Sequence, residues 1–299
     1  MQRNLTNLII VAVVILFVTA CFCRSDRDLL NDSPAQSNKA SSSSPNAGNN
    51  NSSSSSPNST TSRSKEDKGD FTVDHIAVKS SKYVEIDKQV RSERLLEKAA
   101  EQLNKNLILP FDLELRTEEC GQANAFYDSN DTSVTVCYEL MEHFYDTFRG
   151  TGMPDNKAYD KMFDAVRFVF LHEIGHALTD TYKLPITGNE EDAADRCSAF
   201  INLTELGDDG VRAVLAAADS FKIESKRRAT DKTDLADEHL LQEQRFYNSL
   251  CMIYGSNPSK YSNIVTDGYL PKARAERCET EFTRTAESWA TLLRPWRKS

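Results

Sequence analysis

The stretch VRFVFLHEIGHAL, residues 166–178, places two histidines four positions apart within an apolar run. Its apolar residues recur at spacings of three and four, which is the period of an α-helix with one buried face. Residues four apart lie on the same side of a helix, one turn above each other. The sequence therefore predicts a long helix after Pro154 that holds the imidazoles of His172 and His176 close together.

Two imidazoles in this arrangement are typical ligands of one zinc ion. A catalytic zinc ion usually takes three protein ligands and leaves its fourth position to water. The third ligand must come from a neighbouring element, and a second predicted helix begins with the acidic run EEDAAD, residues 190–195. We expect Glu191 to be this ligand. Glu190, at the start of the same helix, could also reach the metal ion and is the alternative.

Two further carboxylates have expected roles beside the metal. Asp195 stands four residues after Glu191, on the same side of the helix, where it would accept a hydrogen bond from the outer nitrogen of His172. Glu173 follows the first histidine and projects near the metal without binding it. It is the expected general base, which takes a proton from the zinc-activated water molecule that attacks a carbonyl group.

A glycine lies between the two histidines. A helix interior usually avoids glycine at a cost of about 1 kcal/mol, so the presence of Gly175 requires a reason. A closely packed neighbour would supply one. The helix that carries Glu191 is the expected neighbour.

Strand patterns precede the histidine helix. We expect strands at residues 107–115, 123–127 and 133–139, and turn residues 128–131 join the last two into a β-hairpin. Helical patterns follow. A small sheet before a mostly helical part indicates an α+β domain.

The helices after the turn have recognisable ends. Thr187 and Glu190 have the spacing of a capping box, and Gly207 is the expected end of the helix that follows them. Further helical segments are expected at residues 234–254 and 271–293.

The seven cysteines exceed what a cytosolic enzyme of this size usually carries, and export would permit disulfides. Cys120 and Cys137 flank the predicted hairpin, whereas Cys251 ends one helical segment and Cys278 lies within the next. We expect those two pairs to be bonded. Cys197 lies among apolar residues of a predicted helix and is expected to be a buried free thiol.

Residues 1–20 are typical of an export signal, with an apolar run from Leu8 to Ala20. This run reaches only about 20 Å as a helix, which is less than a bilayer core requires. The tetrad Val18-Thr19-Ala20-Cys21 is similar to a bacterial lipoprotein box, in which the cysteine is acylated. We expect a membrane anchor through lipid on Cys21, with an ordinary secretory signal or an uncleaved anchor as the alternatives.

Residues 21–70 are expected to form a tether, because Ser, Asn and Pro dominate positions 31–64 and little there is apolar. The folded domain is expected at residues 71–299, in an exported lipoprotein of the cell envelope or, alternatively, in a secreted protein. The formal net charge of −9 is spread along the chain. Binding to nucleic acid through its phosphates is therefore not expected.

The predicted centre resembles that of the gluzincin branch of the zincin metallopeptidases, in which a second helix supplies a glutamate followed four residues later by an aspartate. The residues that carry this resemblance are His172, Glu173, His176, Glu191 and Asp195. Longer segments resemble a metallopeptidase family whose substrate is unassigned, namely residues 120–127, 136–140, 172–178, 190–195, 237–247 and 251–255. The resemblance implies a zincin-like fold, one zinc ion and a peptide or protein substrate.

The resemblance also implies roles for residues outside the metal ligands. In gluzincins a strand ahead of the active-site helix often forms the sheet edge where an extended peptide adds, and Asn124, Ala125 and Phe126 match that strand. A plain hairpin strand is the alternative. Related enzymes often stabilise the oxyanion with a downstream histidine or tyrosine, which implies His239, on a predicted helix, or alternatively Tyr247.

Two histidines remain. His75 lies in the approach to the domain and His143 follows a predicted strand, and both are expected to be ordinary surface or turn residues.

Together these patterns predict a zinc-dependent metallopeptidase that hydrolyses peptide bonds. The alternatives are an exported lipoprotein whose non-catalytic zinc site serves as a binding module, and a metal-dependent amidase acting on cell-wall peptides. Glu173 disfavours the binding module, because a non-catalytic site needs its ligands but not a general base.

Overall fold

The computed structural model describes residues 65–298, so the expected export signal, Cys21 and the tether up to residue 64 lie outside the described range. The last residues assigned to the tether contact the folded domain, since Asp67 lies 2.6 Å from the ammonium group of Lys298. Within residues 65–298, no helix has the length and apolar composition needed to cross a membrane.

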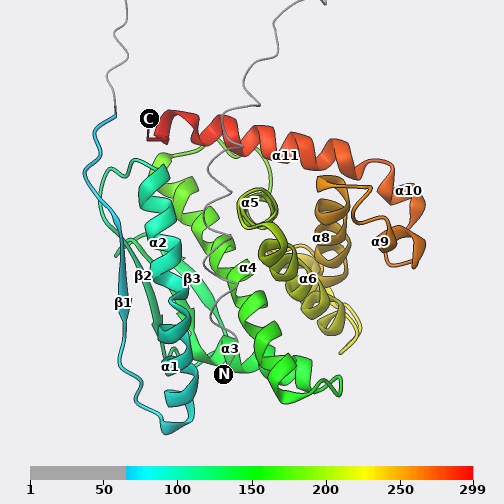
Figure 1. Cartoon of the computed structure of the whole chain (residues 1–299), viewed down its shortest axis with the longest axis horizontal. Helices are drawn as coiled ribbons and strands as arrows, with labels where there is room; N and C mark the ends of the chain where they lie inside the picture. The colour runs from blue at the N-terminus through cyan, green and yellow to red at the C-terminus, as the bar shows by residue number, and fades with distance from the viewer. Residues whose placement is uncertain (1–64, 299) are drawn as a thin grey trace, which may run out of the picture. The chain divides into compact units, whose positions relative to one another are not determined.

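A four-stranded sheet occupies one side of the domain (Figure 1). Its strands in spatial order are β1 (Phe71–His75), β2 (Leu113–Glu118), β4 (Ser133–Cys137) and β3 (Ala125–Asp128). β1, β2 and β4 run parallel, whereas β3 is antiparallel to β4 and forms the predicted hairpin with it. β3 is therefore an edge strand.

The first elements were not predicted from the sequence. A short 3₁₀ turn (Ser81–Tyr83), α1 (Val84–Glu93) and α2 (Leu95–Asn106) connect the parallel strands β1 and β2, which require a crossover of this kind. α2 has a clear helical period, because Leu96, Ala100 and Leu103 recur at spacings of three and four and pack on the core, so this helix could have been recognised from the sequence.

All three predicted strands have different ends in the structure, and the one expected at residues 123–127 is β3, at residues 125–128. The strand expected at residues 107–115 begins only at Leu113, because the residues before it make isolated bridges instead of a ladder. The strand expected at 133–139 stops at Cys137, and the next residue begins α3 (Tyr138–Arg149). An amphipathic helix directly after a buried strand continues the apolar run, so the end of β4 could not be recognised from the sequence.

α4 (Asp155–Tyr182) is the long helix predicted after Pro154, and it runs through the middle of the domain (Figure 1). It packs against α3, β3 and β4, and against α5 (Glu190–Glu205) and α6 (Gly207–Glu224). Residues on all its sides are buried in its second half, as expected for a central helix.

α5 begins with a different cap from the one predicted. The side chain of Asn189, in extended conformation before the helix, accepts a hydrogen bond from the backbone N–H of Asp192 at 3.2 Å. The expected capping box of Thr187 and Glu190 is therefore wrong. Asn is among the best N-cap residues, and it stands closer to the acidic run.

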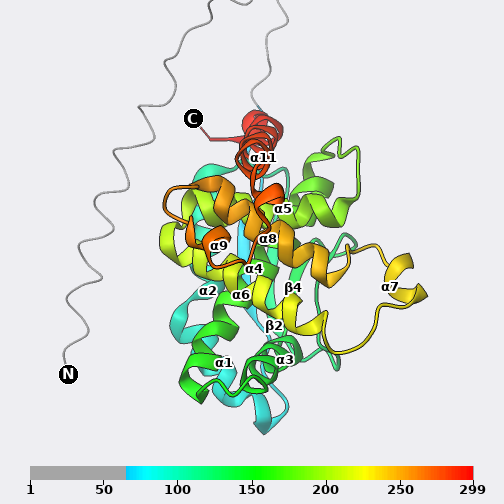
Figure 2. The ribbon, with the colours of Figure 1, turned by 90° about the vertical axis from the view of Figure 1, so that its right-hand side faces the viewer.

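The helix expected at residues 234–254 is interrupted. It consists of a short α7 (Lys232–Ala236) and of α8 (Gln242–Ser256), and residues 237–241 between them are not helical. Figure 2 shows α7 projecting from the helical part on its connecting loops.

The last segment contains three helices. They are α9 (Asn263–Thr266), α10 (Lys272–Ala275) and α11 (Cys278–Leu293), and a final 3₁₀ turn (Arg294–Trp296) follows. α11 packs against α8 and α5 and lies along one side of the domain (Figure 1).

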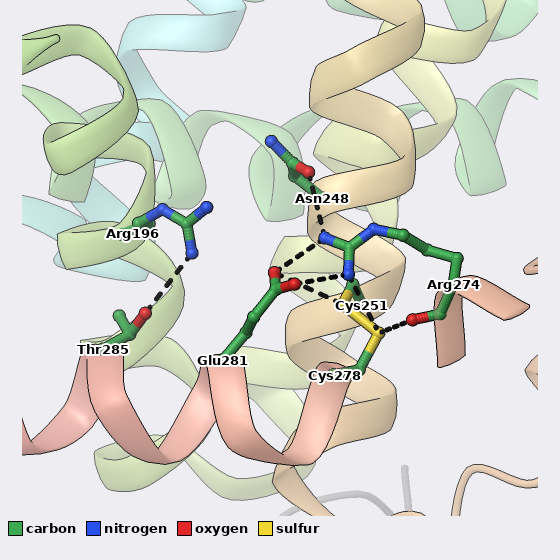
Figure 3. Close-up of a disulfide and its surroundings, with 7 residues drawn as sticks. All are labelled: Arg196, Asn248, Cys251, Arg274, Cys278, Glu281 and Thr285. Atoms are coloured by element: carbon green, nitrogen blue, oxygen red, sulfur yellow. Dashed lines mark hydrogen bonds and ion pairs between the residues drawn. A yellow bond between two sulfur atoms is a disulfide. The ribbon is translucent and has the colours of Figure 1, made fainter. Parts of the chain in front are cut away.

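Both expected cysteine pairs form disulfides in the structure. Cys120–Cys137 joins the start of the hairpin to the end of β4, and Cys251–Cys278 joins α8 to α11 (Figure 3). Cys197 on α5 is a buried free thiol. The domain is α+β, with a small sheet and a mostly helical body.

Candidate metal centre

The two histidines of the central helix face each other. His172 and His176 lie one turn apart on α4, and their Nε2 atoms are separated by 3.1 Å. His172 is buried and His176 is partly exposed. The centre is therefore open to solvent on the side of His176.

Glu191, near the start of α5, completes a group of three ligand atoms. Its Oε2 lies 3.0 Å from Nε2 of His172 and 3.4 Å from Nε2 of His176. Three ligand atoms about 2.0–2.1 Å from one tetrahedral zinc ion would be about 3.3 Å apart. The spacing of the three atoms fits a single ion of this size.

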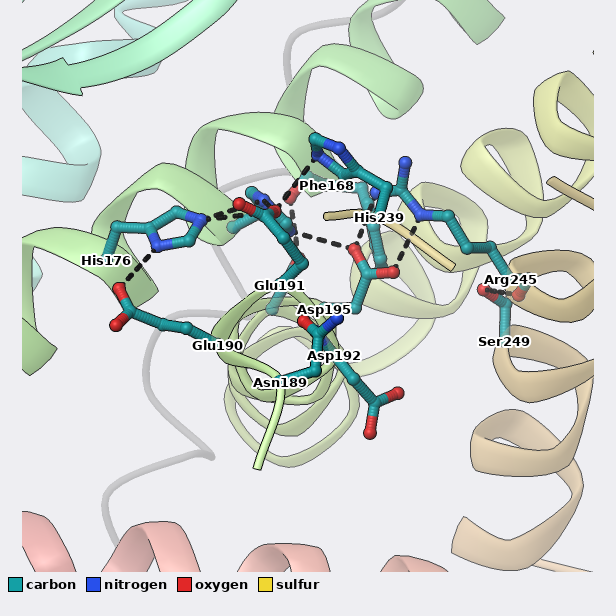
Figure 4. Close-up of polar contacts among 12 residues, drawn as sticks. Phe168, His176, Asn189, Glu190, Glu191, Asp192, Asp195, His239, Arg245 and Ser249 are labelled. Carbon is teal, nitrogen blue, oxygen red and sulfur yellow. Dashed lines mark hydrogen bonds and ion pairs between the residues drawn. The ribbon is translucent and has the colours of Figure 1, made fainter. Parts of the chain in front are cut away.

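Glu190 lies on the other side of the same histidine. Its Oε1 is 2.8 Å from Nδ1 of His176, and its side chain is half exposed (Figure 4). An imidazole directs its two nitrogens to opposite sides of the ring. Glu190 therefore contacts the outer nitrogen of a ligand, and its carboxylate is not part of the group of converging atoms.

Asp195 contacts the outer nitrogen of the buried histidine, as predicted for its position on α5. Its Oδ1 lies 2.9 Å from Nδ1 of His172. The guanidinium group of Arg245, from α8, binds the same carboxylate through two hydrogen bonds of 2.8 Å (Figure 4). The sequence did not predict this arginine, because its contact with Asp195 joins residues 50 positions apart.

Glu173 is buried beside these three candidate ligands. Burial raises the pKa of its carboxyl group, the charges of His172 and His176 oppose that shift, and Glu191 adds to it. The backbone amide of Tyr127, in β3, also lowers this pKa. The edge strand therefore passes next to the expected general base.

The centre concentrates negative charge around the imidazoles. Burial disfavours a charge on His172, but hydrogen bonds with Asp195 and Glu191 outweigh it and raise the pKa to about 9. Burial likewise raises the pKa of Glu191, but its contacts with the histidines outweigh this and hold the pKa well below its usual range. Such a site favours the binding of a cation.

The chain matches a family model over residues 76–293, most of its length. The family is DUF4344, and its description reads "Putative metallopeptidase". The chain belongs to this family. No curated protein and no solved structure matches the chain significantly.

Membership of this metallopeptidase family supports a peptidase role and a bound metal ion. The matched span begins directly after β1 and ends with α11, so it includes His172 and His176, the acidic start of α5 and Arg245. The group of His172, His176 and Glu191 is a candidate metal site of this family member.

His239 lies at the candidate metal centre. The prediction that it lies on a helix is wrong. His239 belongs to the non-helical residues 237–241, and its Nε2 is 3.0 Å from Oε2 of Glu191. Its ring stacks on that of His172 with centroids 6.0 Å apart. The hydrogen bond with Glu191 raises the pKa of His239, which partial burial opposes.

Tyr247 is placed elsewhere. It lies on α8 and packs against the hydrophobic cluster of α6, α8 and α11, with its ring 5.0 Å from that of Phe246. The structure therefore brings His239, and not Tyr247, to the third ligand.

The edge strand contains the residues expected to bind substrate. The N–H of Cys137 donates to the carbonyl oxygen of Asn124. Hydrogen bonding alternates along an antiparallel pair, so the main-chain groups of residues 124 and 126 point to β4, whereas those of Ala125 and Tyr127 face the open edge. Phe126 pairs with Thr135 of β4. Of the three predicted residues, Ala125 is the one whose main chain is available to an added strand.

The two histidines expected at the surface have structural contacts. His75 lies in β1 with a side chain that is only 10% exposed, and it contacts Thr117 and Glu97, so its assignment to an unstructured approach is wrong. His143 follows β4, as expected, on α3, and its exposed side chain places Nε2 3.1 Å from Glu224.

Gly175 has the close neighbour that its position required. A Cβ atom there would lie 3.1 Å from both the Cα of Ala194 and the Cβ of Cys197. α5 therefore approaches α4 at the turn between the two histidines, which brings Glu191 within reach of them.

Proposed function

We propose that the protein is a zinc-dependent metallopeptidase that hydrolyses peptide bonds, with His172, His176 and Glu191 as the metal ligands. The observation that carries this proposal is the convergence of two Nε2 atoms and one carboxylate oxygen at 3.0–3.4 Å, beside the buried Glu173. A zincin-like arrangement, in which α4 supplies the histidines and α5 the glutamate, follows from it.

The donor set supports zinc as the metal. Two imidazole nitrogens and one carboxylate are a common ligand set of catalytic zinc, with a further position for water. Zinc bound there would lower the pKa of a water molecule towards 7 and polarise the carbonyl group of the substrate.

Glu173 is the proposed general base. It accepts the proton of the attacking water and then donates it to the leaving amine. Burial raises the pKa of its carboxyl group, which makes the carboxylate a stronger base near neutral pH. His239 is the proposed donor to the oxyanion, because its Nε2 already lies at the carboxylate of the third ligand.

The substrate is proposed to be an extended peptide or protein segment bound along β3. The main-chain groups of Ala125 and the carbonyl oxygen of Tyr127 would pair with it, and Asn124 and Phe126 would flank it. The Tyr127 amide lies beside Glu173, so a segment paired with this edge passes the general base.

The cellular setting is also proposed. Two disulfides are compatible with an exported protein, and anchoring through lipid on Cys21 is proposed from the tetrad that ends with it. Residues 21–70 would then separate the domain, residues 71–299, from the membrane surface.

Zinc content and peptide hydrolysis test the proposal together. Wild type should contain one zinc ion per chain by elemental analysis and should cleave members of a mixed peptide library. Glu173→Gln should keep the zinc and lower kcat/KM by about 10²–10⁴-fold, because only the base is removed.

Other outcomes would contradict the proposal or favour one of the alternatives. Absence of stoichiometric metal from the wild type would refute the proposal. Zinc in both proteins without cleavage of any peptide would favour a binding module, and cleavage confined to cell-wall peptides would favour the amidase.

A further inference from the structure

We infer that Arg245 is a positioning residue of the metal centre, which holds Asp195 so that this carboxylate keeps His172 directed at the metal ion. The inference rests on the proposed zinc site. Arg245 comes from α8, which is not one of the two helices that supply the ligands.

The arginine binds both oxygens of the carboxylate. Nε of Arg245 donates to Oδ2 of Asp195 and Nη2 donates to Oδ1, each at 2.8 Å. Two parallel hydrogen bonds fix the plane of a carboxylate as well as its position. A lysine would supply the same charge but only a point contact.

The same carboxylate holds the buried ligand. Oδ1 of Asp195 lies 2.9 Å from Nδ1 of His172, so one oxygen contacts both the arginine and the histidine. A proton on Nδ1 leaves the lone pair of Nε2 free to face Glu191 and His176. Rotation of the Asp195 carboxylate would disturb this orientation of the ring.

The surroundings of Arg245 leave it few other contacts. Its side chain is only 11% exposed, and its guanidinium group lies 4.2 Å from the centre of the Phe221 ring on α6. The structure gives the guanidinium no carboxylate partner other than Asp195 among the described residues. A buried cation on an aromatic ring is costly unless it is paired, so Arg245 and Asp195 depend on each other.

Zinc affinity of matched lysine variants tests the inference. Arg245→Lys should weaken Zn²⁺ binding, measured by competition with a chromophoric chelator, by at least about tenfold, because outer partners of metal ligands typically contribute about 10–100-fold. Arg274→Lys is the control, since Arg274 binds both oxygens of Glu281 at 2.8 and 2.7 Å near the disulfide, away from the metal ligands (Figure 3). Its Zn²⁺ affinity should stay within about twofold of wild type.

Two further measurements separate positioning from packing. Bound Co²⁺ should show a changed visible absorption spectrum in Arg245→Lys and an unchanged one in Arg274→Lys, since the spectrum reports ligand geometry. In an Asp195→Asn background, Arg245→Lys should have no further effect on Zn²⁺ affinity, because the arginine acts through that carboxylate. Arg245→Gln replaces the lysine variant if the latter does not fold.

Equal Zn²⁺ affinities of the Arg245 and Arg274 variants would overturn the inference. An equal loss of affinity in the wild-type and Asp195→Asn backgrounds would also overturn it, because the effect would then arise from packing alone. Peptide hydrolysis is a separate readout. A protein whose Zn²⁺ affinity depends on Arg245 but which cleaves no peptide would refute the proposed function and leave this inference standing.

Discussion

Consecutive glutamates contact the same histidine through different atoms. Glu190 lies at Nδ1 of His176, whereas Glu191 lies near Nε2 of both His176 and His172. Neighbours on a helix point about 100° apart, so adjacent residues reach different sides of one ring. This difference makes Glu191 the proposed ligand and Glu190 an outer contact.

The two glutamates should respond differently to the same substitution. Glu191→Gln should weaken Zn²⁺ binding by more than about 100-fold, because it removes a charged ligand, whereas Glu190→Gln should cost at most about tenfold as the loss of an outer partner. Competition with a chelator measures both affinities. The reverse order of losses would assign the third ligand to Glu190.

At the scale of elements, the contact between α4 and α5 brings the proposed ligands together. Gly175 allows that contact because it has no side chain to separate the helices. The segment before α8 has a comparable role. Asp237 accepts a hydrogen bond from the backbone N–H of His239 at 2.8 Å, a local turn that competes with helix formation and directs His239 to Glu191.

A larger residue at position 175 should separate the helices. Gly175→Val is expected to lower the free energy of unfolding by about 1–3 kcal/mol through overpacking, and to weaken Zn²⁺ binding as Glu191 moves away. Denaturant unfolding and chelator competition measure the two effects. Gly188→Val is the control, because a Cβ atom at Gly188 has no neighbour within 4 Å. Similar affinities for the two variants would show that the close approach does not position the ligand.

At the scale of the whole domain, the buried apolar side chains form two hydrophobic clusters. One surrounds the sheet and most of α4, and the other joins α6, α8 and α11 and includes Phe168 of α4. Arg245 connects the two, because it lies on Phe221 of the second cluster and binds Asp195 of α5, a helix whose Cys197 belongs to the first. A metal ion bound to α4 and α5 would therefore stabilise the domain as well as activate it.

Removal of the metal should lower stability by a predictable amount. A site filled at 100 times its Kd adds about 2.7 kcal/mol to the free energy of unfolding, so EDTA should lower the Tm of the zinc-loaded protein. Calorimetry with and without EDTA measures this change. Glu191→Gln should show a much smaller shift, and an equal shift in both proteins would place the stabilising metal at another site.

The sequence by itself determined the features that depend on local spacing. The helix with His172 and His176 on one face and the acidic start of the next helix follow from helical period over a few turns, and the close neighbour of Gly175 follows from the cost of glycine within a helix. The α+β class followed from strand patterns ahead of helical ones. β1 and α1 were missed because they are short and largely polar, whereas α2 was missed despite a clear apolar period.

Only the tertiary structure decided the contacts between distant segments. The choice between Glu190 and Glu191 depends on the angle at which α5 meets α4, and the pairing of Arg245 with Asp195 joins residues 50 positions apart. The open edge of β3 beside Glu173 depends on strand order. Periodicity specifies which face of an element is buried, but the partner that covers this face is selected by packing of the whole domain.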